Sequence, residues 1–375
     1  MVNSLTEIPE VPQKLILDKL DFPAILSLHK TCIDYRNLIE DYKPGKSELQ
    51  IQIDLKKESI DYKLSWPADP RSTKTMKMGW NVRETYKNLN LSYSNLENGC
   101  QIIWKKEDLD PRILFNVQKP KTKILKDQKF LPTFLKDFQI LMDLQRTTVI
   151  FRKFELNVQE NCEEEAGLLY LELEKIFRKN RGIKIRKLQI QTFGNQGVLA
   201  ILPFVNPENL ERISIENAKK SEEFLEKMEE IMESEQWKMA KNVDFRRFVV
   251  PWKLEKYLNF ESFSINIPRI SNQDMVDLRN SILIGAKFKT FGINFQILED
   301  DYKLLESEFG RNMTTPQPEL SILAAWEWKF PEKKRNFVAF LGGNYLSVQP
   351  LNLFEDVEII EINNQPNLPV GNLFR

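Results

Sequence analysis

The chain has 375 residues, of which 42% are hydrophobic and 29% are charged, so it carries enough apolar side chain to bury a sizeable core. Its 54 basic and 54 acidic residues give a formal net charge of zero, which argues against a protein that binds nucleic acid through a general basic excess. The single histidine, His29, excludes a metal site built from several histidines.

The first stretch, residues 1–45, has the spacing of three short helices. Apolar residues recur at helical intervals in each of them, and Asp21 followed by Pro23 is typical of the start of the second. Pro44 and Gly45 predict the end of the third. So short a unit cannot bury enough surface to be stable alone, so we expect it to pack on the rest of the chain, on a partner, or on both.

Residues 46–107 change to a period of two, in which apolar and polar residues alternate. The alternation is clearest in Leu49–Leu55 and Ile60–Trp66, and polar turns separate the successive segments. This pattern is typical of an antiparallel β-meander with one solvent-facing side. The polar segment Pro67–Thr85 within it is predicted to be a long loop.

Residues 108–300 alternate short strands with helices. The strand starts lie roughly 20 to 36 residues apart, which predicts a parallel sheet with right-handed crossovers. Such units, repeated without a reversal of direction, stack as a solenoid of the leucine-rich-repeat type, and a conventional α/β layer is the alternative. The predicted strands are Val149–Val158, Ile185–Gln191, Leu210–Glu216, Val243–Phe248, Ser262–Ile267 and Phe288–Phe295, and the predicted helices are Leu131–Gln145, Glu163–Lys179, Gln196–Phe204, Ser221–Glu235, Trp252–Leu258 and Asn272–Leu283.

Residues 301–375 are predicted to extend or cap the sheet. Their pattern indicates one helix, a group of strands and a tail with two prolines that frays. The helix is expected at Asp301–Phe309, the strands at Ile322–Phe330, Asn336–Leu341, Tyr345–Val348 and Val357–Ile362, and the tail at Gln365–Arg375.

A series of apolar residues, an apolar-Pro pair, a Leu-Asp turn and a cysteine runs through the first forty residues. Its members, in chain order, are Leu5, Ile8, Pro9, Val11, Leu20, Asp21, Leu26, Leu28, Cys32, Arg36 and Leu38. This series resembles an F-box. Two departures bear on the affinity for an adaptor: His29 stands where many F-boxes carry an arginine, and Tyr35 stands where leucine is common.

Four later segments are similar to the FTH, or DUF38-type, region of the nematode F-box A family. They read LKDFQILMDLQ, LAILPFVNPENLERISI, EQWKMAKNVDF and YLNFESFSINIPRISNQDM, and the whole resemblance runs from Leu5 to Phe295. The fold class expected from pattern and resemblance together is therefore mixed α+β and α/β. It comprises a three-helix F-box at 1–45, an antiparallel β-rich connection at 46–107, an FTH-like β/α region resembling an irregular leucine-rich-repeat solenoid at 108–300, and a β-rich cap and tail at 301–375.

The resemblance implies a role in ubiquitin ligation. F-box proteins dock on a Skp-type adaptor, which links them to a cullin, so the chain is expected to recruit an unidentified target protein to a Skp–cullin–F-box ligase. An apolar surface that so small a helical unit leaves uncovered supports this role, because such surfaces usually mark protein interfaces. Each implied adaptor-binding residue belongs either to that interface or to the internal core: Ile8, Pro9, Val11, Ile16, Leu20, Ile25 and Leu28.

Two other functions are the alternatives. The first is a protein-interaction module that works without a ligase in a regulatory complex, with the N-terminal helices as a cap on the following sheet. The second is an enzyme. The sequence argues against it, because it shows no nucleophile–base pair, metal cluster or phosphate-binding loop. We therefore expect no catalytic, cofactor-binding or metal-binding residue and no cofactor.

Five further features of the sequence bear on the function. His29 is a candidate acid–base catalyst, but a surface or interface position is the simpler reading. The acidic side of Ser221–Glu235 is interpreted as a solvated helix face, and the basic run Arg178–Lys187 as a helix end, so no nucleic acid partner is expected. Trp326–Phe330 is expected to pack in the core, with an exposed aromatic patch as the alternative, and Leu341–Asn344 predicts a hairpin turn.

The cysteine content and the N-terminus predict a reducing compartment. Three widely spaced cysteines without a CxxC pair do not form a disulfide framework, so we expect the cytoplasm or the nucleus. The first ten residues, MVNSLTEIPE, lack the basic and apolar regions of a signal peptide. No apolar stretch approaches the roughly 20 residues that span a bilayer, so no membrane association is expected.

Overall fold

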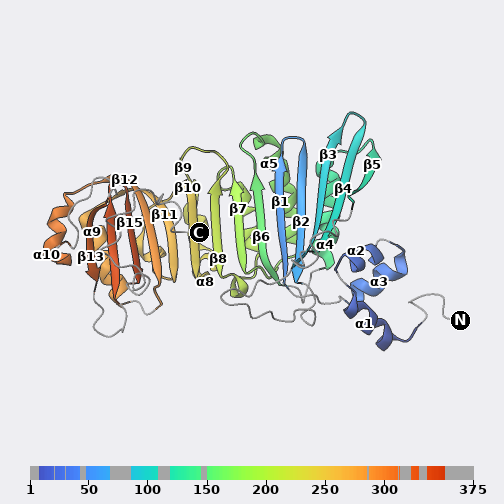
Figure 1. The fold of residues 1–375 in the computed structure, drawn as a ribbon, viewed down its shortest axis with the longest axis horizontal. Coiled ribbons are helices and arrows are strands. Elements are labelled where there is room, and N and C mark those ends of the chain that lie inside the picture. Colours follow the sequence, from blue (N-terminus) through green and yellow to red (C-terminus); the bar gives the residue numbers. More distant parts are fainter. Residues whose placement is uncertain are drawn as a thin grey trace. The chain divides into compact units, whose positions relative to one another are not determined.

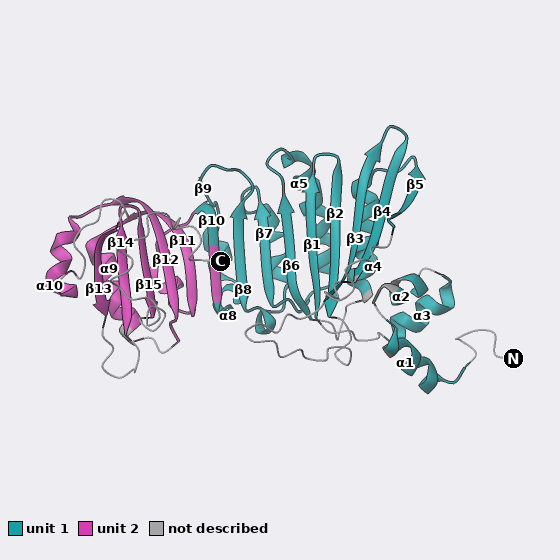
Figure 2. Cartoon of the chain, viewed as in Figure 1, with its two compact units in different colours: residues 1–241, 245–248 teal, residues 242–244, 249–375 magenta. Residues whose placement is uncertain are grey.

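The computed structural model describes residues 8–20, 22–29, 31–42, 48–67, 86–108, 119–144, 150–284, 287–310, 312, 322–328 and 336–350. The chain divides into two compact units, of which unit 1 comprises residues 1–241 and 245–248 and unit 2 comprises residues 242–244 and 249–375 (Figure 2). Residues 68–85 of the predicted loop Pro67–Thr85, the strand Val357–Ile362 and the tail Gln365–Arg375 lie outside the described residues.

Unit 1 begins with three helices, α1 (Glu10–Lys19), α2 (Phe22–His29) and α3 (Ile33–Tyr42). They enclose a small core of fully buried apolar side chains, to which each helix contributes one: Leu17, Ile25 and Ile39. The side chain of Ile140, from the later helix α4 (Phe130–Leu144), packs against this core. The three helices therefore rest on the remainder of unit 1, as their small size requires.

The sheet of unit 1 is mixed. Neighbouring strands follow the order β8-β7-β6-β1-β2-β3-β4-β5, in which β8, β7, β6 and β1 are parallel and β1 to β5 are antiparallel. The strands are β1 (Leu49–Lys56), β2 (Ser59–Pro67), β3 (Tyr86–Leu96), β4 (Gly99–Asp108), β5 (Lys121–Lys126), β6 (Phe151–Val158), β7 (Lys187–Thr192) and β8 (Arg212–Asn217).

Helices α4 and α5 cover one face of this sheet (Figure 1). Helix α5 (Glu163–Lys179) has three glutamates in its first turn and two cations in its last, an arrangement that stabilises both ends of the helix dipole. The shorter elements of unit 1 are α6 (Gln196–Leu199), η2 (Leu202–Phe204), η3 (Pro207–Asn209), β9 (Glu223–Phe224), α7 (Met228–Glu233) and α8 (Glu235–Met239).

An aromatic cluster fixes α4 on the sheet. Phe138 contacts the rings of four neighbours, and Phe134 stacks on it with a centroid distance of 5.7 Å. The Tyr93 hydroxyl donates a hydrogen bond of 2.9 Å to Oδ2 of Asp137, and burial together with this carboxylate raises the pKa of Tyr93 far above its ordinary value. The rings of the cluster are those of Tyr62, Tyr93, Phe134, Phe138, Phe154 and Phe177.

Unit 2 contains a second mixed arrangement of strands. Strands β10, β11 and β12 are parallel, and β12 continues through β15 and β14 to β13 in antiparallel pairs. Its elements are β10 (Asn242–Val249, whose residues 245–248 belong to unit 1), η4 (Leu254–Lys256), β11 (Ser262–Ile270), α9 (Asn272–Ile284), β12 (Thr290–Leu298), η5 (Tyr302–Leu305), α10 (Glu306–Phe309), β13 (Ile322–Trp328), β14 (Phe337–Gly342) and β15 (Tyr345–Pro350).

The predicted fold class, a three-helix F-box and a β-meander followed by a leucine-rich-repeat-like solenoid, is wrong. In unit 1 the first strand of the chain pairs in parallel with β6, so that Ile53 of β1 lies between Tyr62 of β2 and Leu156 of β6. The meander therefore continues the edge of the parallel strands instead of forming a separate region. Alternating apolar residues in β1 fit a parallel and an antiparallel neighbour equally well, so the sequence period could not reveal this pairing.

Alanine substitution at two glycines of unit 1 is expected to change the free energy of unfolding in opposite directions. Gly99, the first residue of β4, has a φ of +148°, and a Cβ there would collide with the backbone carbonyl of Leu125. Gly167 lies within α5, and a Cβ there would meet nothing. Gly99→Ala is expected to lower the free energy of unfolding by at least about 2 kcal/mol, whereas Gly167→Ala is expected to raise it by about 0.5–1 kcal/mol.

Urea denaturation followed by circular dichroism measures both variants. Equal changes of the same sign in the two would contradict this account of the backbone at Gly99 and Gly167.

Candidate functional site

Helix α1 carries apolar side chains on two opposite faces. Gln13 and Leu17 face the core of the three helices, and the Gln13 side chain donates a hydrogen bond of 2.9 Å to the carbonyl of Ile8. Val11 and Leu15, one helical turn apart, lie about half a turn away from that buried face. They are 69% and 57% exposed. We call Val11, Leu15 and the neighbouring exposed Ile16 the α1 surface.

The residues predicted to bind an adaptor fall into different environments. Val11 and Ile16 belong to the α1 surface, and Pro9, which precedes the helix, is also exposed. Ile8 is partly exposed. The remaining three serve the internal packing, because Ile25 is part of the buried core and Leu20 and Leu28 pack against it.

Leu15 is exposed but was not among the predicted residues. Its spacing of four from Val11, on the side of the helix away from Leu17, is the sequence signal that could have found it.

His29 is buried, so its predicted position at the surface or an interface is wrong. Its Nε2 lies 3.0 Å from Oε1 of Glu40, which connects α2 to α3. This contact places the sole histidine in the internal structure of the three helices.

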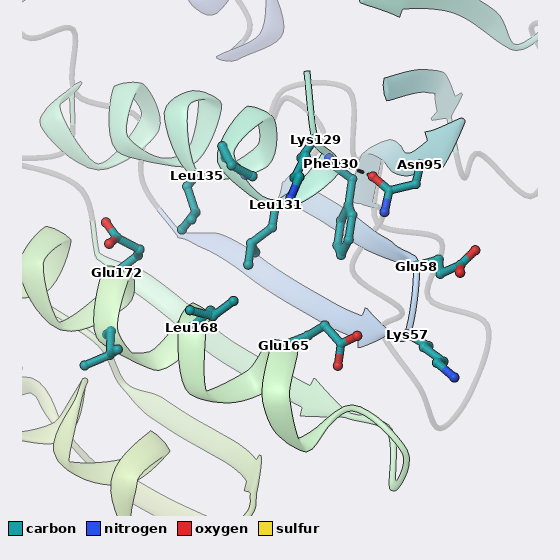
Figure 3. Close-up of a pocket in the computed structure, with 12 residues that line it drawn as sticks. Lys57, Glu58, Asn95, Lys129, Phe130, Leu131, Leu135, Glu165, Leu168 and Glu172 are labelled. Atoms are coloured by element: carbon teal, nitrogen blue, oxygen red, sulfur yellow. Dashed lines mark hydrogen bonds between the residues drawn. The ribbon is translucent and has the colours of Figure 1, made fainter. Parts of the chain in front are cut away.

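A second apolar site lies on the helical side of unit 1, between α4 and α5 (Figure 3). It is a groove of about 710 Å³, within the range of about 300–1,000 Å³ that is usual for binding sites. Leu131 and Leu135 of α4 point toward α5, and Leu168 of α5 points back toward them. We call it the α4/α5 groove, and its lining residues are Lys57, Glu58, Asn95, Lys129, Phe130, Leu131, Pro132, Leu135, Glu165, Leu168, Leu171 and Glu172.

Asn95, near the end of β3, contacts the first residue of α4 beside the α4/α5 groove. Its side-chain oxygen accepts a hydrogen bond of 3.2 Å from the backbone N–H of Phe130, the first residue of α4. A side chain of β3 thereby supplies the partner for a backbone N–H that has none within the helix. The groove was missed from the sequence because its two walls come from helices separated by a strand.

The opposite face of the sheet in unit 1 is polar. Asn157 donates to Asp54 at 2.7 Å and to Glu155 at 3.2 Å, and Gln52 donates to Asp54 at 2.9 Å. The side chains of this face are engaged with one another, so a ligand would have to displace those contacts.

A cavity of about 470 Å³ lies at the strand ends on this side, lined among others by Lys56, Lys220 and Arg247. Each of the three cations has a carboxylate partner in unit 1: Lys56 lies 2.6 Å from Asp61, Lys220 lies 3.9 Å from Glu160, and Arg247 pairs with Glu216. The cavity therefore has little uncompensated charge with which to attract an ion.

Cations of the basic run Arg178–Lys187 form ion pairs within unit 1. Lys179 lies 3.0 Å from Asp143, and Arg186 lies 3.3 Å from Glu48. Arg178 pairs with Glu174 and lies over the ring of Phe204. These contacts agree with the interpretation of the run as a helix end.

The tryptophans of β13 pack inside unit 2. Trp326 and Trp328 are buried, and both contact the ring of Phe309 edge to face. The core interpretation is confirmed for Trp326 and Trp328, and Phe330 lies outside the described residues. The hairpin turn predicted at Leu341–Asn344 is confirmed too, because β14 ends at Gly342, and Gly343 and Asn344 connect it to the antiparallel β15.

Several observations concern other classes of site. Among the described helices none is long and apolar enough to cross a lipid bilayer. Within the described ranges, no three His, Cys, Asp or Glu side chains gather as metal ligands. Cys32 is exposed, Cys100 and Cys162 are buried, and all three thiols are free.

In the comparisons with known proteins, one family model matches part of the chain. Residues 169–308 match the FTH domain, which confirms the FTH part of the resemblance seen in the sequence. FTH domains are associated with F-box proteins, and the match is consistent with a role in protein interaction. No curated protein and no solved structure matches the chain.

Proposed function

We propose that the chain is a substrate-recruiting adaptor of a Skp–cullin–F-box type ubiquitin ligase, acting in the cytoplasm or nucleus. Helices α1–α3 bind a Skp-type adaptor protein, and the strand-rich remainder binds a target protein. The chain promotes ubiquitin transfer by proximity, because the complex holds the target beside a ubiquitin-charged enzyme that the cullin brings. No residue of this chain acts in the transfer itself.

The α1 surface is the observation that carries this proposal. The three helices already have a complete core in Leu17, Ile25 and Ile39, yet α1 still exposes Val11 and Leu15 on its other side. Apolar side chains gathered on a surface usually mark a protein interface. The F-box resemblance of the first forty residues and the FTH match together support a Skp-type adaptor as the protein that covers them.

Co-expression of the full chain with a Skp-type adaptor tests the proposal. We expect a complex of one adaptor per chain that survives size-exclusion chromatography. A folded chain that elutes separately from the adaptor at micromolar concentration would refute the ligase assignment. Circular dichroism of the separated chain establishes that it is folded.

The alternative is a protein-interaction module that works without a ligase. The α4/α5 groove supports this candidate too, because helices α1–α3 contribute none of its lining residues. Failure to bind the adaptor, combined with binding of a protein ligand at the groove, would support the alternative over the ligase adaptor.

A further inference from the structure

Helix α5 presents apolar residues on two faces, as α1 does. Leu169 and Leu173 are buried on the side of the sheet. Leu168 and Leu171 line the α4/α5 groove instead and are 59% and 58% exposed. Two leucines this exposed on a helix whose core face is already complete indicate a surface that another molecule covers.

The spacing on the two walls of the α4/α5 groove fits a helix. Leu131 and Leu135 are four residues apart on α4, and Leu168 and Leu171 are three apart on α5, so each wall repeats once per helical turn. An amphipathic helix with apolar residues at intervals of three and four matches that repeat, as in other helix-in-groove complexes. The exposed leucines leave the groove open along its length, which suits a polypeptide better than a small molecule that must be mostly enclosed.

The charges of the α4/α5 groove differ between its walls. Glu165 and Glu172 of α5 lie two turns apart, about 10 Å along the helix. Glu165 makes no hydrogen bond or ion pair with the described residues, and Glu172 has only an exposed pair with Lys175 at 2.5 Å, of a kind that contributes little stability. Across the groove, Lys129 precedes α4.

The charged residues of the β1–β2 turn do not change this difference in charge between the two walls. Lys57 and Glu58 are neighbours in that turn and offset each other. The α5 wall is therefore acidic, and the α4 wall carries the cation.

We propose that the α4/α5 groove binds an amphipathic helical segment of a partner protein, with a lysine- or arginine-bearing flank beside Glu165 and Glu172. The apolar side of the segment lies against Leu131, Leu135 and Leu168. Its acidic or neutral flank lies beside Lys129, so the charge difference between the walls sets its orientation. The inference deepens the proposed function, because it names the chemistry of a target and the place where it docks.

Selection of displayed helical peptides on the purified full chain tests this proposal. The probe is a library of helix-forming peptides of about 16 residues, a length that allows partial helicity in water. We expect the enriched peptides to combine apolar residues at intervals of three and four with lysine or arginine along one flank. Enrichment of peptides without that basic flank, or of none that bind, would overturn the proposal.

Fluorescence anisotropy then measures one enriched peptide against surface variants. Leu168→Glu, and separately the pair Glu165→Lys and Glu172→Lys, are each expected to weaken binding at least about tenfold, because they place charge in the apolar contact or reverse the attraction. Two exposed residues outside the groove supply matched controls: Glu164→Lys on α5 and Met239→Glu on α8 should bind as the unchanged chain does. A charge-reversed peptide should recover affinity for the Glu165→Lys, Glu172→Lys chain.

Three results would contradict the groove as the site. Peptide binding that is unchanged by Leu168→Glu would place the peptide elsewhere, and so would an equal loss in the controls. A dimer of the free chain that Leu168→Glu dissociates would show that a second copy occupies the groove. None of these measurements needs the Skp-type adaptor, so they stand or fall separately from adaptor binding by α1–α3.

Discussion

Replacing Val11 and Leu15 together by aspartate is expected to weaken binding of a Skp-type adaptor at least about 100-fold, or about 2.7 kcal/mol, without unfolding the chain. Both side chains are mostly exposed in the free chain, so the substitutions remove little internal contact. In the complex, however, they would leave two carboxylates in an apolar interface without partners, which is costly. Isothermal titration calorimetry with the purified full chain measures the change.

The choice of positions decides what this experiment reports. Leu20 and Leu28 pack against the buried Ile25, so aspartate at either of them would disrupt the three helices, and lost binding would then report unfolding. Phe224 supplies a matched control because it is 64% exposed elsewhere in unit 1, and Phe224→Asp should leave adaptor binding unchanged. Full adaptor affinity in the Val11→Asp, Leu15→Asp chain would exclude the α1 surface as the docking site.

Local elements of this chain could be predicted well where side-chain signals agree. Helix α5 was predicted at Glu163–Lys179 and has those bounds, because acidic residues at its start, basic residues at its end and an apolar stripe all indicate the same helix. The strands around it were found to within a few residues, since each is a short apolar run between polar turns.

The prediction of secondary structure was wrong where the backbone conformation of a single residue, rather than the side-chain pattern, determines where a helix begins. Ser221–Glu235 was predicted as one amphipathic helix, yet Glu223–Phe224 form β9 and α7 begins only at Met228. Lys227 between them has a φ of +50°, a left-handed conformation that interrupts any helix. The apolar spacing in this segment suits α7 but does not show where the helix begins.

The candidate sites show the same division between local and distant information. Val11 and Ile16 of the α1 surface were among the residues that the F-box resemblance implied. The implied set also contained Leu20, Ile25 and Leu28, since the resemblance does not separate the exposed side of a small helical unit from its core. The α4/α5 groove depends on how two helices pack on one sheet, which no local pattern records.

Helix α4 connects three features of unit 1. Phe134 and Phe138 join the aromatic cluster on the sheet, Leu135 lines the α4/α5 groove, and Ile140 packs against the core of α1–α3. Because one helix serves all three, loosening it should disturb the groove and the N-terminal helices together. Phe138 is the position to test, since it contacts the rings of Tyr62, Phe134, Phe154 and Phe177 and is fully buried.

Phe138→Ala is expected to lower the free energy of unfolding by about 3–5 kcal/mol, because it removes buried apolar surface and leaves a cavity among four rings. Urea denaturation measures the loss, with Phe224→Ala as an exposed control that should change stability by less than about 0.5 kcal/mol. Hydrogen exchange should show lost protection first in α4, β2, β6 and α5, the elements whose rings contact Phe138. A loss below about 1 kcal/mol would contradict the cluster as the anchor of α4, because a cavity in a close-packed core costs more than that.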